Sequence, residues 1–200
     1  MIKAILKPGL LLLSFTIVSI FFVSWTQDAT QIKIKYNEEQ LLIQRLSELV
    51  VNYDNDILQE KYHQTLTLHG VHQTISIYPA KRNGKIFAYL IEHTYPNGYN
   101  GDIRLLTGVS VEQTLLGVRV ITHKETPGLG DKIETRKSNW IKQFTGLSLV
   151  NPLQKDWKVE RDGGVFDAFT GATITPRAIV TASYQVLELF SKQGFSGQTK

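Results

Sequence analysis

A long apolar stretch near the N-terminus dominates the hydrophobic pattern of the chain. From Pro8 to Gln27, 20 consecutive residues carry no charged side chain. A helix rises about 1.5 Å per residue, so this stretch would span about 30 Å, the hydrocarbon thickness of a bilayer. The stretch is long for a signal peptide, and no small-x-small pair closes it. We therefore predict a retained transmembrane helix, with a cleaved signal peptide as the alternative.

The charges that flank this stretch predict its orientation. Lys3 and Lys7 precede it and no acidic residue does, which favours a cytoplasmic N-terminus. Lys33 and Lys35 on the far side weaken this asymmetry without reversing it. We expect a single-pass protein of the bacterial inner membrane, with its main domain in the periplasm of a Gram-negative cell.

The pattern changes after the apolar stretch. Residues 30–36 alternate apolar and basic side chains, which we interpret as a short amphipathic linker. Asn37 with Gln40 three residues later resembles a capping box, and the leucines that follow keep helical spacing to about Val51. We therefore predict a separate linker and helix over residues 29–62.

The middle of the chain has the pattern of an antiparallel sheet. The sequence becomes extended from His63, and β-forming residues fill 74–78 and 85–95, on either side of the hairpin signal Asn83-Gly84. Two more strands are predicted at 103–109 and 114–123. Because helical patterns lie at both ends of this region, the expected fold class is α+β.

The last helix is predicted to follow a turn of small residues. Thr175 suits the N-cap position and Pro176 the first helical position. The apolar stripe comprises Ile179, Ala182, Val186, Leu187 and Phe190, and Gly194 is the expected stop. Thr173 then lies just before a helix N-terminus, where free backbone N–H groups favour a phosphate. An ordinary capped helix without a ligand fits the same local pattern.

Composition narrows the possible chemistry. The formal net charge of the 200 residues is only +4, and no basic stripe indicates nucleic-acid binding. The chain has no cysteine, which excludes disulfides, thiol catalysis and thiolate-bound iron–sulfur clusters. Redox chemistry in this chain would therefore need an added cofactor.

The segment Asp167-Ala168-Phe169-Thr170-Gly171-Ala172-Thr173 resembles a known modification motif. It is similar to the flavinylation motif of the FMN-binding domain in the G subunit of Rnf-type electron transport complexes. A similar motif occurs in the related C subunit of the sodium-translocating NADH:quinone oxidoreductase. The resemblance implies that Thr173 carries FMN through a phosphoester, with Thr170, Gly171 and Ala172 beside it. It also implies that a separate flavin transferase attaches the FMN and reads Asp167.

A second segment carries the same resemblance. Glu125-Thr126-Pro127-Gly128-Leu129-Gly130 is similar to a family segment that precedes a Trp-containing helix, here around Trp140. In the family this loop lies against the flavin, which makes Glu125, Thr126, Leu129 and Gly130 candidate flavin contacts. Without the resemblance, the segment has the pattern of an ordinary strand-to-helix connection with close backbone approach.

Histidines and aromatic residues offer further candidates for chemistry. His69 and His72 are spaced three apart, but they lie in a β-leaning region without cysteine, so we predict no metal site. The aromatic residues that could stack on a flavin are Tyr89, Tyr95, Tyr99, Trp140, Trp157 and Phe169. Of these, we expect Trp140 and Phe169 nearest the ring.

The combined prediction is an α+β protein with a single N-terminal transmembrane helix and an antiparallel-sheet FMN-binding domain flanked by helices. The expected boundaries are 1–28 for the N-terminus and transmembrane helix, 29–62 for the linker and helix, and 63–200 for the FMN-binding domain. The resemblance implies an electron-transfer subunit of an Rnf-type ion-translocating complex, with covalent FMN and other membrane subunits as partners. The alternatives are a membrane-tethered assembly protein without redox activity and a stand-alone flavinylated carrier outside the cytoplasm.

Overall fold

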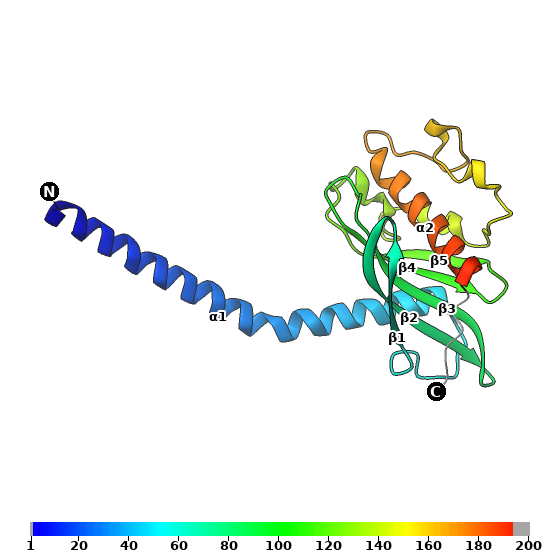
Figure 1. The fold of residues 1–200 in the computed structure, drawn as a ribbon, viewed down its shortest axis with the longest axis horizontal. Helices are drawn as coiled ribbons and strands as arrows, with labels where there is room; N and C mark the ends of the chain where they lie inside the picture. The colour runs from blue at the N-terminus through cyan, green and yellow to red at the C-terminus, as the bar shows by residue number, and fades with distance from the viewer. Residues whose placement is uncertain (1, 194–200) are drawn as a thin grey trace. The chain divides into compact units, whose positions relative to one another are not determined.

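The computed structural model of the chain describes residues 2–193. By their internal contacts, the residues fall into two compact units, Met1–Ile43 and Gln44–Lys200. The first consists of most of helix α1, and the second contains the sheet and the C-terminal helix (Figure 1). The expected helix stop at Gly194 lies outside the described residues.

Helix α1 (Ile2–Leu49) is one continuous α-helix. It is the one helix among residues 2–193 that is long and apolar enough to cross a membrane. The predicted linker at 30–36 and the helix start at Asn37 are therefore wrong. Residues 28–37 contain neither glycine nor proline, so no local breaker interrupts the helix that begins upstream. The predicted end near Val51 is confirmed to within two residues.

The predicted antiparallel sheet is confirmed. Its five strands lie in sequence order, with each strand antiparallel to the next (Figure 1). They are β1 (Tyr62–Leu68), β2 (Val71–Arg82), β3 (Lys85–Tyr95), β4 (Ile103–Ser110) and β5 (Leu115–Thr122). Asn83 and Gly84 both have positive φ, 52° and 70°, at the β2–β3 hairpin, as a type I′ turn requires.

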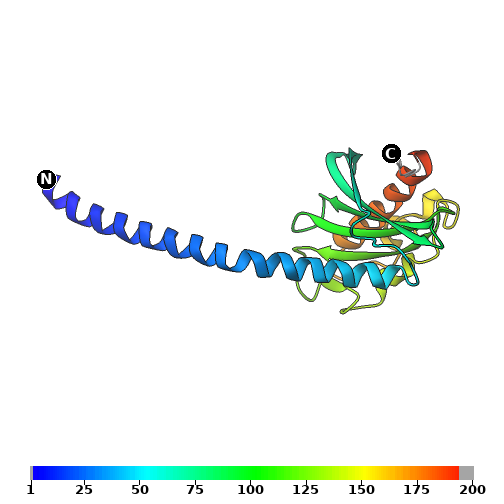
Figure 2. The same ribbon diagram turned by 90° about the horizontal axis from the view of Figure 1, so that it is seen from below.

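Both faces of the sheet are covered, which explains why β4 and β5 are apolar at nearly every position (Figure 2). Leu105 and Val109 of β4 belong to the core shared with helix α2 (Ile174–Gln193). On the opposite face, Leu49 packs against Gly108 and Gly117, where an added Cβ would meet its side chain at 3.7 and 2.8 Å. Helix α2 therefore packs on one face of the sheet through its apolar residues.

The start of α2 differs from the predicted one. The helix begins at Ile174, and the Thr173 carbonyl accepts the Arg177 N–H at 3.3 Å. Thr175 is 1% exposed and lies inside the first turn, so its assignment as N-cap is wrong. Pro176 also lies in the first turn, where its missing N–H needs no intrahelical partner. Thr173 is therefore the residue immediately before the helix.

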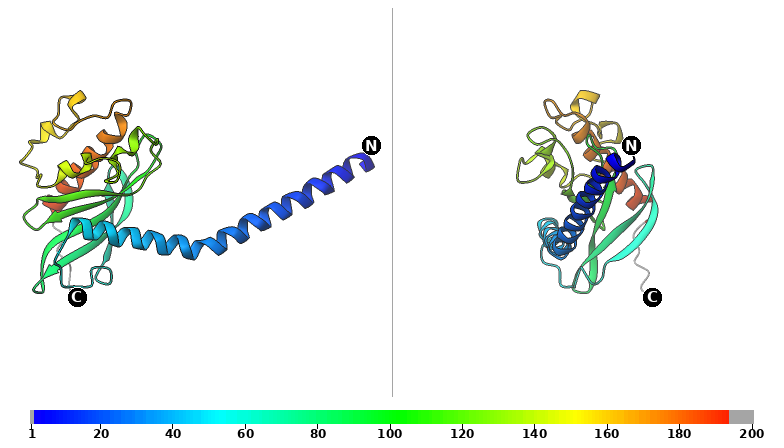
Figure 3. Two further views of the ribbon diagram at one scale, coloured as in Figure 1. Left: turned by 180° about the vertical axis from the view of Figure 1, so that it is seen from behind. Right: turned by 90° about the vertical axis from the view of Figure 1, so that its left-hand side faces the viewer.

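The segment between β5 and α2 is loop-rich and contains four short 3₁₀ helices: η1 (Gly130–Ile133), η2 (Trp140–Phe144), η3 (Gln154–Asp156) and η4 (Glu160–Asp162). The expected Trp-containing helix is thus a short 3₁₀ helix. Figure 3 shows this segment and the N-terminal end of α2 at the same end of the domain. The two sequence motifs lie at this end.

Candidate functional site

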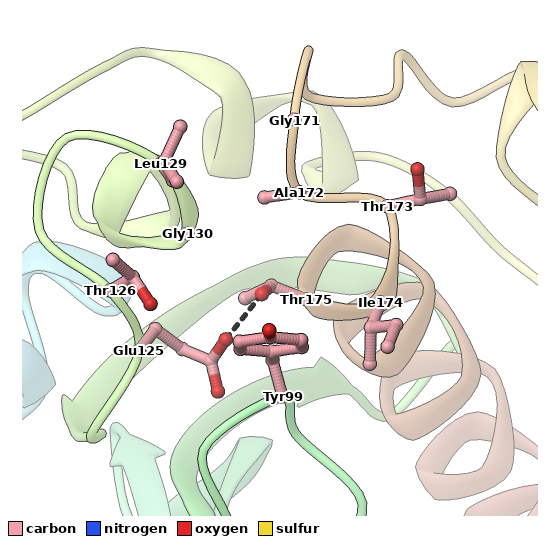
Figure 4. A pocket seen from close by; sticks show the side chains of 10 residues that line it. All are labelled: Tyr99, Glu125, Thr126, Leu129, Gly130, Gly171, Ala172, Thr173, Ile174 and Thr175. Carbon is pink, nitrogen blue, oxygen red and sulfur yellow. Dashed lines mark hydrogen bonds between the residues drawn. The ribbon is translucent and has the colours of Figure 1, made fainter.

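A pocket of about 430 Å³ opens at the N-terminus of α2. Its size falls in the range of small-molecule sites, roughly 300–1,000 Å³. Figure 4 shows that the lining side chains come from three segments: the loop before β4, the loop after β5, and the turn that leads into α2. The lining residues are Tyr99, Glu125, Thr126, Leu129, Gly130, Gly171, Ala172, Thr173, Ile174 and Thr175.

The turn before α2 depends on Gly171. Its φ is +82°, in the left-handed region that glycine adopts without strain, and an added Cβ would lie 3.3 Å from Leu129 Cδ2. The Ala172 N–H donates to the Phe169 carbonyl at 3.1 Å and closes the turn. Residues 171–173 therefore form a close wall of the pocket opposite Leu129, and the chain enters the helix directly after Thr173.

Glu125 joins all three segments. It is 4% exposed, and its Oε2 accepts a hydrogen bond from the Thr175 hydroxyl (Figure 4). Its Oε1 accepts the Asn100 N–H at 3.3 Å. A Cβ on Gly130 would lie 2.9 Å from Thr175 Oγ1 and 3.0 Å from Glu125 Oε2, so only glycine leaves room for this pair. Because burying a carboxylate without partners is costly, the two donors explain how the charge is tolerated here.

The loop after β5 is held by its own hydrogen bonds. The N–H groups of Leu129 and Gly130 donate to the Thr126 carbonyl at 3.2 and 3.0 Å. Asp131 Oδ1 accepts the Gly128 N–H at 2.8 Å, and this hydrogen bond is the main cause that lowers the pKa of the Asp131 carboxyl. The loop is therefore fixed by interactions within its own residues and keeps Leu129 at the pocket.

A cation lies at the Thr173 side chain. Arg161 Nη1, from the η4 turn, donates to Thr173 Oγ1 at 3.1 Å. The neighbouring Arg177 instead forms a bidentate pair with Asp162, at 2.6 and 2.8 Å. Hydrogen bonds from Arg177 lower the pKa of Asp162, so this carboxylate stays charged in its pair. Of these two arginines, Arg161 is the one that reaches Thr173.

The structure brings seven of the nine predicted site residues together. Glu125, Thr126, Leu129, Gly130, Gly171, Ala172 and Thr173 all line the pocket. Thr170 and Asp167 do not line it, and both are exposed on the surface. The Asp167 carbonyl accepts the Trp140 indole N–H at 2.9 Å. That these residues bind a flavin or are read by a transferase stays a prediction.

Three lining residues and Arg161 are absent from the nine predicted site residues, although Tyr99 is among the six aromatic residues that could stack on a flavin. Tyr99 follows the Pro96–Gly98 turn, and its exposed ring reaches the pocket only because that loop folds against Glu125. The sequence pattern predicts Ile174 and Thr175 only as part of the helix start. Nothing in the spacing of the sequence indicates Arg161, since its contact with Thr173 depends on the tertiary fold.

The two aromatic residues expected nearest the flavin pack against each other. Trp140 and Phe169 contact each other edge to face, with ring centroids 4.9 Å apart, and neither lines the pocket. Phe169 is 7% exposed and belongs to the core cluster. Tyr99 is thus the aromatic residue at the pocket.

Two of the histidines, His69 and His93, form a buried hydrogen-bonded chain, and neither lines the pocket. His69 is not paired with His72, since its Nε2 lies 2.9 Å from His93 Nδ1 and its Nδ1 lies 2.5 Å from Gln185 Oε1. His93 Nε2 lies 2.9 Å from Thr107 Oγ1. Burial lowers the pKa of both histidines, and the neighbouring His69 lowers that of His93 further. We interpret this chain as a structural hydrogen-bond network between the sheet and α2.

Comparisons with known proteins agree with this organisation. Residues 98–188 match the family model of the FMN-binding domain, and residues 1–49 match that of the RnfG N-terminal region. The first match spans all three segments of the pocket.

Full-length relatives extend the likeness to nearly the whole chain. The chain is 44% identical over 190 residues to the G subunit of the ion-translocating oxidoreductase complex of Vibrio cholerae (serotype O1, strain M66-2), covering 94% of this chain and 91% of the relative. It is 44% identical over 183 residues to the G subunit of Shewanella baltica (strain OS223), covering 88% and 85%. The corresponding protein of Vibrio vulnificus (strain YJ016) is 41% identical over 190 residues, covering 94% and 90%. The chain therefore belongs to the family of the G subunits of ion-translocating oxidoreductase complexes.

Proposed function

We propose that this chain is the flavin-carrying electron-transfer subunit of a membrane-bound, ion-translocating oxidoreductase complex, with FMN attached through its phosphate to Thr173. The observation that carries the proposal is the position of Thr173. Its side chain lies at the rim of a pocket that both sequence motifs line, immediately before the N-terminus of α2. The FMN-binding domain match and the relatives' names support the same conclusion.

The helix start suits the phosphate end of the cofactor. A phosphodiester keeps one negative charge, and the first N–H groups of α2 have no intrahelical acceptors. The helix dipole favours such a charge by about 0.3–1 kcal/mol at an exposed site. Attachment at Thr173 would therefore place the anion where the backbone already favours one.

The rest of the pocket suits a flat, largely apolar ring. Leu129, Ala172, Ile174 and the Tyr99 ring offer apolar surface, and Thr126 adds a hydroxyl group at the wall. When bound, FMN supplies the one- and two-electron redox chemistry that the side chains of this cysteine-free chain lack. The residues of the chain bind and orient the ring and keep it beside the redox partners.

Two proteins would meet this site in turn. Attachment requires a flavin transferase, and the exposed Asp167 lies outside the pocket, where another protein can reach it. Electron transfer requires other subunits of the complex, as the relatives' names indicate. The exposure of Tyr99, 63%, leaves the pocket rim open to such partners.

We further propose that α1 anchors the chain in the bacterial inner membrane, with the N-terminus cytoplasmic and the main domain periplasmic. Lys3 and Lys7 support this orientation. We also propose that the membrane-spanning part of the chain ends at residue 28 and that the FMN-binding domain begins at residue 63. Because the chain has no cysteine, single-cysteine variants report orientation directly. In intact spheroplasts, an impermeant maleimide should label Asn97→Cys but not Ala4→Cys, and the reverse pattern would refute the orientation.

The attachment site is tested by in-gel flavin fluorescence after denaturation. The chain is co-expressed with a flavin transferase as wild type and as Thr173→Ala. The proposal predicts a fluorescent band for the wild type alone. Fluorescence that survives in the variant would move the attachment elsewhere, and a dark wild-type band would favour the assembly protein without redox activity.

A further inference from the structure

The Arg161 guanidinium lies at the proposed attachment atom, and its charge also helps to lower the pKa of the Asp162 carboxyl. Its Nη1 donates to Thr173 Oγ1 at 3.1 Å. Among residues 2–193, no carboxylate lies within ion-pairing distance of Arg161. Arginine side chains commonly form ion pairs with carboxylates, and the carboxylate of the next residue in the chain, Asp162, is close by. Asp162, however, is engaged by both Nε and Nη2 of Arg177.

The turn that carries Arg161 is braced on both sides. Within η4, the Asp162 N–H donates to the Val159 carbonyl at 2.8 Å and the Gly163 N–H to the Glu160 carbonyl at 2.9 Å. Val159 is fully buried, which anchors the start of the turn in the core. The Asp162–Arg177 pair ties the end of the turn to the first turn of α2. Arg161 is therefore presented to Thr173 by a fixed backbone, which limits the ordering that ligand binding would require.

We propose that Arg161 is the phosphate-binding residue of the Thr173 site and makes the site selective for a phosphorylated flavin. The inference rests on the proposed function and adds to it a residue that neither sequence motif contains. A guanidinium offers five N–H donors in a planar fork that matches phosphate oxygens, with one positive charge opposite the single charge of a phosphodiester. Arg161 contacts the hydroxyl before attachment and the phosphate oxygens after it.

Arg161 would act during the step that attaches the flavin phosphate to Thr173. Thr173 Oγ1 forms a bond to phosphorus of a flavin adenine dinucleotide donor, whose pyrophosphate bond breaks. Adenosine monophosphate leaves with the electron pair of that bond, and the hydroxyl proton passes to the transferase or to water. Arg161 opposes the negative charge at phosphorus and holds Oγ1 through a lone pair that the new bond does not use. Arg161 thus binds the substrate phosphate and holds the attacking hydroxyl group.

The first test measures covalent attachment to the full-length chain in detergent. Purified transferase and flavin adenine dinucleotide are added, and intact mass reports the labelled fraction over time. Arg161→Gln should slow labelling about tenfold, the usual scale of a lost charge-assisted hydrogen bond. Arg161→Lys keeps the charge and should recover part of the rate. Lys158→Gln, an equal charge change at an exposed position three residues earlier, should stay within about twofold of wild type.

The second test needs no transferase. Unlabelled chain is titrated with FMN and, separately, with riboflavin, which lacks the phosphate. Arg161→Gln should weaken FMN binding about tenfold and leave riboflavin binding unchanged, whereas Lys158→Gln should change neither. A purely structural role for Arg161 would weaken both ligands together. Equal melting temperatures of the unlabelled variants check that the fold is retained.

The outcomes separate the two levels of the proposal. If wild type takes up no flavin at Thr173, the proposed function itself is refuted. If wild type is labelled and Arg161→Gln is labelled at the same rate, with the same preference for FMN over riboflavin, only the role of Arg161 is refuted. Slower labelling of Arg161→Gln with partial recovery in Arg161→Lys supports the assignment.

Discussion

Thr175 offers the sharpest test of how the pocket is held together. Its hydroxyl donates to the buried Oε2 of Glu125 and joins the start of α2 to the loop after β5. Replacing Thr175 by valine keeps the shape of the side chain and removes only the donor. We predict that Thr175→Val destabilises the domain because Oε2 then loses its hydroxyl partner inside the protein.

The magnitude follows from the burial of the acceptor. Glu125 is 4% exposed, and hydrogen bonds to charged groups contribute about 1.5–3 kcal/mol to the free energy of unfolding. The Asn100 N–H remains on the other carboxylate oxygen, so a value of about 2 kcal/mol is expected. For a domain of this size, about 2 kcal/mol lowers the melting temperature by roughly 4–8 °C.

Thermal unfolding of the full-length chain in detergent, followed by near-UV circular dichroism, measures this effect. Thr175→Ser is the matched control, because it keeps the hydroxyl and removes one methyl group at a cost of about 0.8 kcal/mol. Serine should therefore be less destabilising than valine. In a double-mutant cycle with Glu125→Gln, the two changes should be non-additive. A valine variant as stable as wild type, or a serine variant less stable than valine, would refute the role of this hydrogen bond.

Two further predictions concern the buried histidines and Gly130, which lies close to Glu125 and Thr175. Burial lowers the pKa of His69 and His93 below the ordinary value of 6.5, so the folded state stays neutral where the unfolded state takes up protons. Stability is therefore fully present above about pH 6.5 and should fall as the pH drops toward 5, and urea melts of His93→Gln should show a shallower fall. Gly130→Ala should cost about 1–3 kcal/mol through overpacking against Glu125 and Thr175, measured as a lower melting temperature and a lower labelled fraction.

The sequence predicted those parts of the fold that depend on residues close together in the chain. The strand spacing and the Asn83-Gly84 hairpin predicted the sheet, because turn chemistry and alternation act within a few residues. The end of the first helix was also predicted, but the predicted break at 30–36 is absent, because α1 is continuous over Ile2–Leu49. Alternating apolar and basic residues do not interrupt a helix that is already formed, since elongation is easier than nucleation.

The start of α2 shows where local reasoning failed. Threonine before proline is a good helix-start signal, and it placed the N-cap at Thr175. In the fold, the Thr175 hydroxyl instead bonds to Glu125, which is 50 residues earlier in the chain. The Thr175 hydroxyl is bonded to Glu125 and so does not cap the helix. The helix begins one residue before Thr175, at Ile174, directly after Thr173.

The two motifs predicted most of the residues that line the pocket, but the prediction missed the residues outside the motifs. The resemblance identified seven residues that the fold gathers around one pocket. It gave no signal for Tyr99 or Arg161, which reach the pocket and Thr173 from loops without a recognisable motif. Trp140 and Phe169 were expected at the ring because large aromatic residues stack well, and that contact stays a prediction, since the two residues pack against each other and do not line the pocket.

The central claim, FMN esterified to Thr173, is tested most directly by mass spectrometry of the chain isolated from its native membrane. Peptide mapping should show the peptide that contains Thr173 heavier by one FMN less one water, with fragment ions placing the added mass on that residue. A fully unmodified peptide over residues 167–177, in material purified with its native partner subunits, would contradict the account.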